Sequence, residues 1–512
     1  MKLKAVLTGG DRPGKAVTLG IQHVFAMFGS TVLVPALTGL DPAVTLFCMG
    51  IGTLIFHLIT KGIVPAFMGS SFAFIEAIGM VTKYCSDHNI ANFPSYVGWG
   101  IMASGVLYVI LSFVVKLFGA KRITSFFPPV VTGCMIIIIG MMLAPTAMSN
   151  ITTVHGDFAQ DTVLIADLNK APENGYRYMM QLDASGNTVV SGWVLEQDLV
   201  LKETDRNDPE YVNPGNQYVV ENISGVSMKN QAEADSATVA GTQQWKNAVV
   251  AVFTVIVIVL VMFAAKGFLK LIPILIGIVA GYLLSMALGM VDTSNVLANG
   301  VINYPHIQLP AFENWDAIIY SITMIAPISI VTFVEHVGDI TANGAVTGQD
   351  YIENPGLHRT LLGCGLASIF SGGMGGPAAT TYSENTGVLA ATRNYNPATL
   401  RIAAVFAILL AFLAPVSGIL NTIPTAVMGG VSIVLFGMIA SVGLRMLVEN
   451  KVDFTKSRNL IIAAVMMVIG LGLSDGISIG SVTVSATAIA AALGVILNKV
   501  LPGEEKVKEP VK

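Results

Sequence analysis

Residues 371–387, SGGMGGPAATTYSENTG, decide the fold class of this chain, because they are polar and glycine-rich yet lie among long apolar stretches. A segment that opens with four glycines and a proline in seven residues cannot form a continuous stable helix. Irregular backbone at the depth of a membrane is tolerated only where it is buried in protein or lines a cavity. We therefore expect an extended segment that feeds a half-helix, whose first N–H groups are free to bind a ligand.

The composition outside this segment is that of a polytopic α-helical membrane protein. Of the 512 residues, 53% are hydrophobic and 12% are charged, and the mean hydropathy is +0.70. A soluble domain carries roughly 25% charged residues. Hydropathy predicts about fourteen spans, at roughly 17–37, 43–60, 64–82, 97–118, 126–146, 247–265, 268–290, 317–340, 359–373, 376–392, 398–419, 424–445, 459–474 and 480–500. The third, ninth and tenth are short or rich in glycine and polar residues, so we expect them to depart from ordinary helices.

Basic residues between the spans predict the orientation. Lys and Arg gather in alternate loops and near both termini, as they do in cytoplasmic segments. Trp99, Trp245 and Trp315 fall at the predicted outer ends of spans, where aromatic belts lie. We expect both termini in the cytoplasm of a multi-pass protein of the inner (plasma) membrane. No short apolar region with a cleavage site follows the basic start of the chain, so we expect the first apolar run to be retained.

Charge and cysteine content argue against several other classes of protein. The net charge of −4 is small and dispersed, so no nucleic-acid partner is expected. The four cysteines share no metal-type spacing and form no disulfide framework. We see no nucleophile and base arranged for catalysis, and we expect neither an enzyme nor a cofactor or metal.

Residues 147–245 differ in kind from the rest of the chain. They contain fourteen acidic and five basic residues, a net charge of −9. Alternating stretches at 178–182 and 188–194 flank the turn signal at 184–187, which predicts a β-hairpin. We interpret this region as a polar extracytoplasmic insert, either a variable loop or a domain that binds a partner.

The two halves of the chain resemble each other. The fifth span opens with Pro128 and Pro129, the twelfth opens with Pro424, and each contains two glycines seven residues apart. Seven spans per half predict an inverted repeat, as in many secondary transporters. Residues 1–146 would hold the first five spans of repeat 1, residues 246–290 its last two, and residues 317–500 repeat 2. Residues 65–74, PAFMGSSFAF, would be the counterpart of the glycine-rich segment and would cross near it.

Ionisable residues within the spans are the candidate functional groups. A carboxylate inside a membrane costs a few kcal/mol, so such residues face a cavity or a partner. Glu335 and Asp339 lie four residues apart, on one face of the eighth span. Glu384 follows the glycine-rich segment, where a carboxylate suits a ring N–H and helix-start N–H groups suit a carbonyl oxygen. The remaining candidates, each with a structural alternative, are Glu76, His336 and His23.

These motifs resemble the nucleobase–ascorbate transporter family, also called nucleobase:cation symporter-2. The family signature is Gln, Glu or Pro, then Asn-x-Gly, four residues, then Thr and Arg. Here it is complete, running from Glu384-Asn385-Thr386-Gly387 to Thr392-Arg393. The Gln22-His23 pair, the Gly-Ser-Ser-Phe-Ala-Phe stretch at 69–74 and the Glu-His-Val-Gly stretch at 335–338 also match. The resemblance covers nearly the whole chain except residues 147–245.

The resemblance implies a substrate and a set of ligands. Glu384 is typical of bacterial uracil permeases, whereas xanthine and urate members have Gln at that position. Glu335 and Glu384 would hydrogen-bond the pyrimidine ring, and the backbone amides of Phe72 and Ser383 would bind its carbonyl oxygens. Other residues implied by the family are Tyr382 and Ser30 at the pocket, and Asp339, His336 and His23 with Glu335 in proton coupling. The chain departs from a close relative at Ser30, Ser383 and Asp339, where that relative has Ala, Gly and His.

The family also implies an architecture and a mechanism. A core domain of spans 1–4 and 8–11 would move against a gate domain of spans 5–7 and 12–14, within a homodimer. Uracil and a proton would enter together by alternating access, with Glu335 as the proton carrier, because protonation removes the cost of a buried charge. The alternative is a purine symporter of the same family. A sulfate-type anion exchanger would share the seven-plus-seven plan, but two ionised carboxylates would repel its substrate.

Overall fold

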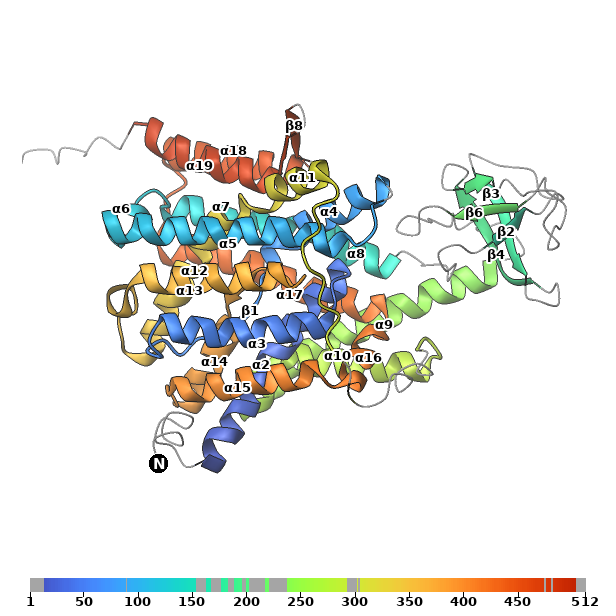
Figure 1. Cartoon of the computed structure of the whole chain (residues 1–512), viewed down its shortest axis with the longest axis horizontal. Helices are drawn as coiled ribbons and strands as arrows, with labels where there is room; N and C mark the ends of the chain where they lie inside the picture. Colours follow the sequence, from blue (N-terminus) through green and yellow to red (C-terminus); the bar gives the residue numbers. More distant parts are fainter. Residues whose placement is uncertain are drawn as a thin grey trace, which may run out of the picture. The chain divides into compact units, whose positions relative to one another are not determined.

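The chain forms two compact units, Met1–Ala147 with Phe253–Lys512 as unit 1 and Met148–Val252 as unit 2. Both appear in the computed structural model drawn in Figure 1. The structure describes residues 13–88, 90–152, 163–166, 176–182, 188–195, 199–201, 217–220, 237–291, 302, 304–473, 476–479 and 482–502.

The first half of the chain is a series of apolar helices, many of which begin at proline. Proline suits the first turn, where its fixed φ is helical and its missing N–H has no partner to lose. At α3, Asp41 also accepts hydrogen bonds from the backbone N–H groups of Ala43 (2.6 Å) and Val44 (3.2 Å). The helices are α2 (Pro13–Thr38), α3 (Pro42–Ile59), η1 (Phe72–Phe74), α4 (Ile75–Asp87), α5 (Phe93–Phe118), α6 (Ala120–Thr124), α7 (Pro129–Met142), α8 (Ala144–Thr152), α9 (Ala237–Ala264), η5 (Gly267–Leu271) and α10 (Pro273–Ala287).

The second half repeats this pattern with more interruptions. Its helices are α11 (Trp315–Ile325), α12 (Ile328–Thr347), η6 (Ile352–Gly356), α13 (Leu357–Gly373), α14 (Ser383–Thr392), α15 (Pro397–Ala411), α16 (Ala414–Asn421), α17 (Thr425–Glu449), α18 (Ser457–Gly472) and α19 (Ala486–Val500). The structure interrupts two of the expected spans. The span at 317–340 falls within Trp315–Thr347, which is long and apolar enough to cross a membrane, and the break between α11 and α12 lies next to Pro327, because proline lacks the N–H that a continuous helix needs there. The span at 398–419 likewise divides into α15 and α16, with Pro415 in the first turn of α16.

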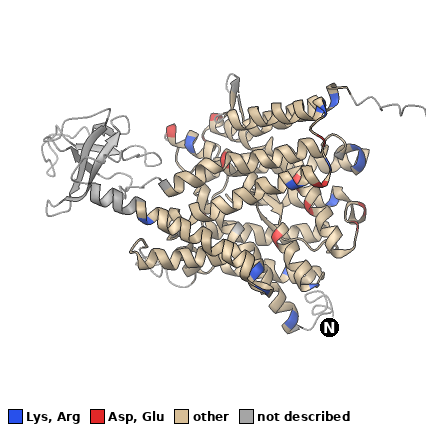
Figure 2. Cartoon of the chain, turned by 180° about the vertical axis from the view of Figure 1, so that it is seen from behind, with Lys and Arg blue, Asp and Glu red and all other residues tan. Residues whose placement is uncertain are grey.

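Seven helices among the described residues are long and apolar enough to cross a membrane. Four shorter apolar helices accompany them, namely α10, α15, α18 and α19. The expected third, ninth and tenth spans are absent from both groups, as their glycine and polar content predicted. They correspond to α4, α13 and α14, of 13, 17 and 10 residues. Figure 2 shows that the helices of unit 1 carry few charged residues along their middle portions, as a multi-pass membrane protein requires.

Two groups of helices make up unit 1. In the first group, successive neighbours are α11, α5, α13, α3, α15 and α2, as can be followed in Figure 1. In the second group, α7 packs against α17, α18 and α19, and α10 packs against α17. Small residues let the helices approach closely. A Cβ added to Gly365 of α13 would lie 2.8 Å from the carbonyl oxygen of Gly105 in α5, and one on Gly443 of α17 would lie 2.6 Å from that of Gly133 in α7.

The buried apolar side chains follow the same division. One cluster gathers residues of α2, α3, α5 and α12 to α15, with Phe56, Phe67 and Phe333 at its centre. A second gathers residues of α7, α10 and α17 to α19, together with a few from α2 and α12. Most helices of the first group thus share one interior and those of the second group another, while α11 packs with α4 and α5 in a third cluster.

Unit 2 contains a five-stranded antiparallel sheet with strand order β4-β3-β2-β6-β5. The predicted hairpin is confirmed, since β3 (Tyr176–Leu182) pairs with β4 (Thr188–Leu195), and Tyr178 lies opposite Trp193. The turn signal at 184–187 lies outside the described residues. The other strands are β2 (Val163–Ala166), β5 (Leu199–Leu201) and β6 (Gln217–Val220).

Candidate functional site

Two short strands from opposite halves of the chain pair at the centre of unit 1. β1 (Met68–Ser70) and β7 (Ala379–Thr381) run antiparallel, with Gly69 opposite Thr380. The pairing extends beyond both ends, because Ser71 N donates to Ala378 O (3.0 Å) and Tyr382 N donates to Phe67 O (3.0 Å). The glycine-rich segment therefore meets its counterpart at residues 65–74, as the sequence predicted.

Each strand leads directly into a helix start. β1 is followed by η1 at Phe72 and then α4, and β7 is followed by α14 at Ser383. Neither start carries a side-chain cap, at Ser71 or at Tyr382. The first N–H groups of a helix have no partner within the helix, so two sets of donors lie at the two ends of this crossing. Phe72 is half-buried and Ser383 is exposed.

Tyr382 holds the two strands together where they cross. Its ring lies directly against Gly69, where a Cβ would overlap it. Its hydroxyl donates to Ser70 O (2.9 Å) and lies 3.1 Å from Ser70 Oγ. Ser70 Oγ in turn donates to Thr31 O on α2 (3.3 Å). The ring is buried, so these bonds fix both strands to the first helix.

Three carboxylates converge on this crossing from α12 and α14. Asp339 Oδ2 accepts from Thr381 Oγ1 (3.0 Å), and Asp339 Oδ1 accepts from Ser383 Oγ (2.5 Å). Glu335 lies one turn earlier on α12 and is half-buried. It lies close enough to Asp339 and Glu384 for their charges to interact, and it makes no hydrogen bond or ion pair to the residues that the structure describes. Glu384 is the second residue of α14.

His336 lies beside Glu335 in sequence but binds a different helix. The buried ring places Nε2 at 2.9 Å from Thr360 Oγ1 and Nδ1 at 3.4 Å from Cys364 Sγ, both on α13. Thr360 Oγ1 also donates to Leu357 O (3.0 Å), so its proton is used and His336 Nε2 is the donor. The ring is thus held in the α12–α13 interface.

His23 joins α2 to the start of α14. Asn385 Nδ2 donates to His23 O (3.1 Å) and lies 3.1 Å from His23 Nδ1. Both side chains are buried. The histidine therefore contacts the second residue of the Glu384-Asn385 pair, and it fixes the half-helix from the side of α2. The side chain of Ser30 lies outside the described part of the chain.

Sequence reasoning missed three polar contacts that build the site. Thr381 bonds Asp339, Ser70 bonds Tyr382 and Asn385 bonds His23. The role of Thr381 could have been predicted, because side chains two residues apart on an extended segment point to the same side. Thr381 and Ser383 are two residues apart, and both donate to Asp339. Asn385 is part of the recognised signature, but nothing in a single sequence pairs it with α2.

The arrangement suits a small polar ring. Carboxylates offer acceptors and the two helix starts offer donors, a set that matches a cyclic amide carrying both N–H and C=O groups. Among the described residues no group of three or more His, Cys, Asp and Glu side chains could hold a metal ion. The four cysteines are buried and unpaired.

Thr381→Val tests whether Asp339 depends on the strand for its hydrogen bonds. A hydrogen bond to a charged group contributes about 1.5–3 kcal/mol, so the variant should melt several degrees below the wild type. Thermal unfolding in detergent measures this shift. Thr341→Val is the matched control, because Thr341 is exposed and its hydroxyl donates only to Val337 O on its own helix. Equal melting of the two variants would contradict the assignment.

Comparisons with known proteins support a common origin and a common fold. Residues 14–171 and 217–479 match the model of a family described as "Permease family". The chain is 36% identical over 514 residues to a uracil permease of Bacillus caldolyticus, which covers 99% of this chain and 97% of that protein. It is 32% identical over 484 residues to a uracil permease of Escherichia coli strain K12, covering 94% of this chain and 90% of that protein.

Solved transporter structures share the fold at low sequence identity. The transmembrane domain of a cyanobacterial bicarbonate transporter, BicA, superposes with a TM-score of 0.56 at 14% identity, covering 93% of this chain and 96% of that one. The overall structure of SLC26A9 gives a TM-score of 0.58 at 13% identity, covering 95% of this chain and 64% of that one.

Proposed function

Because this chain belongs to the permease family, we propose that it is a uracil permease that carries uracil across the inner (plasma) membrane. The observation that carries this proposal is the near full-length similarity to uracil permeases at 32–37% identity. Glu384 at the head of a complete family signature agrees with it, since uracil-transporting members have Glu at this position. The chain is thus a multi-pass transporter.

We propose fourteen membrane segments in a seven-plus-seven inverted repeat, with both termini in the cytoplasm. The β1–β7 pairing supports a repeat, because each half contributes one extended segment followed by a helix start. The core domain would comprise α2 to α5 and α11 to α15, and the gate domain α7, α9, α10 and α17 to α19. The grouping of the buried apolar side chains favours this division, because one cluster draws mainly on α3, α13 and α15 and another mainly on α7 and α17 to α19, with α2 and α12 contributing to both. A homodimer is part of the same proposal.

We propose that uracil lies between the carboxylates and the two helix starts. Glu384 would accept a hydrogen bond from a ring N–H, and Glu335 would bond the ring from α12. The backbone N–H groups of Phe72 and Ser383 would donate to the two carbonyl oxygens. Tyr382 would line the pocket, and Ser30 is included from the family pattern alone. This set satisfies both the donors and the acceptors of the pyrimidine.

We propose that uptake is coupled to protons through Glu335. Three carboxylates share the site, and Asp339 already has two hydroxyl donors, whereas Glu335 has no hydrogen bond to the described residues. A proton on Glu335 would remove the cost of a buried and unpaired charge. Asp339 stands one turn away to exchange that proton. His336 and His23 would act indirectly, since each is bonded to a neighbouring helix element.

Glu335→Gln should separate binding from coupling. The amide keeps a donor and an acceptor for uracil but cannot exchange a proton, so we expect at least a tenfold loss of pH-driven accumulation. Radiolabelled uracil uptake into proteoliposomes under an imposed pH gradient measures this. Counterflow exchange of uracil without a gradient is the control and should persist. Accumulation that still follows the pH gradient would rule out Glu335 as the carrier.

A purine symporter of the same family is the alternative. It would share the fold and differ in pocket size and in preference at position 384. Competition of radiolabelled uracil uptake by unlabelled xanthine separates the two substrates. Strong inhibition by xanthine, with weak inhibition by excess unlabelled uracil, would favour the purine carrier.

A further inference from the structure

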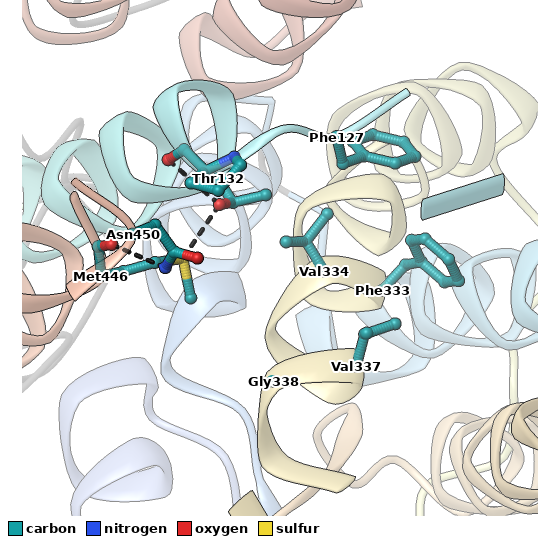
Figure 3. Close-up of a pocket in the computed structure, with 9 residues that line it drawn as sticks. Phe127, Thr132, Phe333, Val334, Val337, Gly338, Met446 and Asn450 are labelled. Carbon is teal, nitrogen blue, oxygen red and sulfur yellow. Dashed lines mark hydrogen bonds between the residues drawn. The ribbon is translucent and has the colours of Figure 1, made fainter. Parts of the chain in front are cut away.

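A cavity lies between α12 and the helices α7 and α17, and none of the residues assigned above lines it. Its volume is about 180 Å³. Figure 3 shows the aromatic side chains toward α12 and the polar side chains toward α7 and α17. The lining residues used below are Phe127, Thr132, Phe333, Val337, Gly338 and Asn450.

We propose that this cavity is a second binding station for the transported pyrimidine, through which uracil passes between the central site and the membrane surface. The inference rests on the proposed function, because it names the same substrate. It adds a site where α12 of the proposed core domain faces residues in and next to α7 and α17 of the proposed gate domain.

The position of the cavity connects it to the central site. Val334 and Gly338 line it, and each is followed at once in sequence by Glu335 or Asp339. Successive residues of a helix are about 100° apart, so the cavity face and the carboxylate face of α12 adjoin. The cavity runs from Phe333, which is 1% exposed, to Asn450, which is exposed. A solute leaving the carboxylates along α12 would therefore enter it.

The polar groups of the cavity can form hydrogen bonds with one edge of uracil, where a C=O and an N–H lie side by side. Asn450 Nδ2 donates to Met446 O (2.8 Å), which leaves the amide with one further N–H and the Oδ1 acceptor. One donor beside one acceptor is complementary to the C=O and N–H of uracil. Thr132 Oγ1 lies 2.9 Å from Met446 Sδ and 3.2 Å from Pro129 O, so its single proton is used and its lone pairs can accept a second ring N–H.

The apolar wall and the volume suit one planar ring. Phe127 and Phe333 have ring centroids 5.5 Å apart and planes inclined by 56°. Such a pair offers an aromatic surface to a flat ligand. Pockets for drug-sized ligands measure about 300–1,000 Å³, so a cavity of about 180 Å³ suits a smaller molecule such as a single ring. A lipid chain would leave the second N–H and the Oδ1 of Asn450, and the lone pairs of Thr132 Oγ1, without a complementary group.

Thiol labelling tests occupancy directly. The four native cysteines are buried, so Val337→Cys adds one half-buried thiol at the cavity wall. We expect saturating uracil to slow its alkylation by N-ethylmaleimide at least threefold. Adding Asn450→Leu should abolish that protection while uracil still binds the purified protein. Protection that survives Asn450→Leu, or its absence at saturating uracil, would overturn the second station.

Filling the cavity tests its role in transport. A Cβ on Gly338 would meet only Met446 Cε, at 4.0 Å, so Gly338→Phe extends into open space. We expect uptake to fall at least tenfold while the Kd for uracil changes less than threefold. Gly437→Phe is the matched control, because Gly437 is exposed on α17 and a Cβ there meets nothing within 4 Å. It should transport at the wild-type rate.

The outcomes separate the two proposals. A wild-type protein that neither binds nor transports uracil would overturn the proposed function and this inference together. A wild type that transports uracil, with Gly338→Phe transporting equally fast, would overturn the second station alone. If Gly338→Phe does not fold, the labelling of Val337→Cys decides between the same outcomes.

Discussion

Glu384→Gln is expected to weaken uracil binding about 10- to 100-fold. The carboxylate would accept a charge-assisted hydrogen bond from a ring N–H, and such bonds contribute about 1.5–3 kcal/mol. The amide that replaces it can accept only a weaker, neutral bond. It can also turn its own N–H toward the ring N–H, where two donors would oppose each other. Equilibrium binding of radiolabelled uracil to the purified protein measures the change.

A surface glutamate provides the control for Glu384. Glu449 is 68% exposed and pairs with Arg445 at 3.8 Å on its own helix. Glu449→Gln removes one negative charge from the exposed end of α17, a helix that carries none of the residues proposed to bind uracil at the crossing, so uracil affinity should stay within twofold of the wild type. Wild-type affinity in Glu384→Gln would remove this residue from the ligand set. The substrate assignment would then rest on the relatives alone.

Gly69→Ala is expected to abolish uptake and to lower the thermal stability of the protein sharply. The new Cβ would overlap the ring of Tyr382, which would have to leave its place. Its bond to Ser70 O would break with it. Overpacking costs about 1–3 kcal/mol, and an unmade buried hydrogen bond adds about 1–3 kcal/mol. Size-exclusion chromatography after heating, together with uptake in proteoliposomes, measures both effects.

Two further variants identify the cause of that loss. Gly437→Ala should behave as the wild type, because nothing lies within 4 Å of its Cβ. Tyr382→Ala removes the ring that the methyl group strikes, so adding Gly69→Ala to Tyr382→Ala should lower the stability far less than Gly69→Ala lowers that of the wild type. A Gly69→Ala protein that melts like Gly437→Ala would contradict the close packing at the crossing.

Local composition was enough to predict where the membrane helices are interrupted. Glycine and proline around residues 65–74 and 371–377 disfavour a continuous helix by backbone propensity alone. In the structure a short strand interrupts the helices at each place, β1 within the first segment and β7 directly after the second. The break in the eighth span was not predicted. The apolar run continues across Pro327, and hydropathy does not account for the backbone N–H that proline lacks. The span expected at 480–500 begins instead with β9 (Val482–Val484), which pairs with β8 (Ile477–Ile479).

The sequence predicted the carboxylates of the site but not the hydrogen bonds that position them. Glu335, Asp339 and Glu384 stand out because a membrane penalises each of them. Thr381, Ser70 and Asn385 are small polar residues, which a membrane helix tolerates at little cost, so hydropathy does not distinguish them. Their partners lie far away in the sequence, on α12, just after β7 and on α2, and a single sequence does not show these pairings.

The pairing of β1 with β7 implies a delay during synthesis of the chain, because the two strands are made at different times. Tyr382 is 312 residues beyond Ser70, whose carbonyl it binds. At ribosomal speeds of about 5–20 residues per second, the first strand waits roughly 15–60 s for its partner. Backbone groups left open in hydrocarbon each cost several kcal/mol, so the nascent segment needs water, lipid headgroups or an insertase around it during that interval. The machinery that inserts this chain is thus expected to keep the first strand unpaired until about three-quarters of the protein has been made.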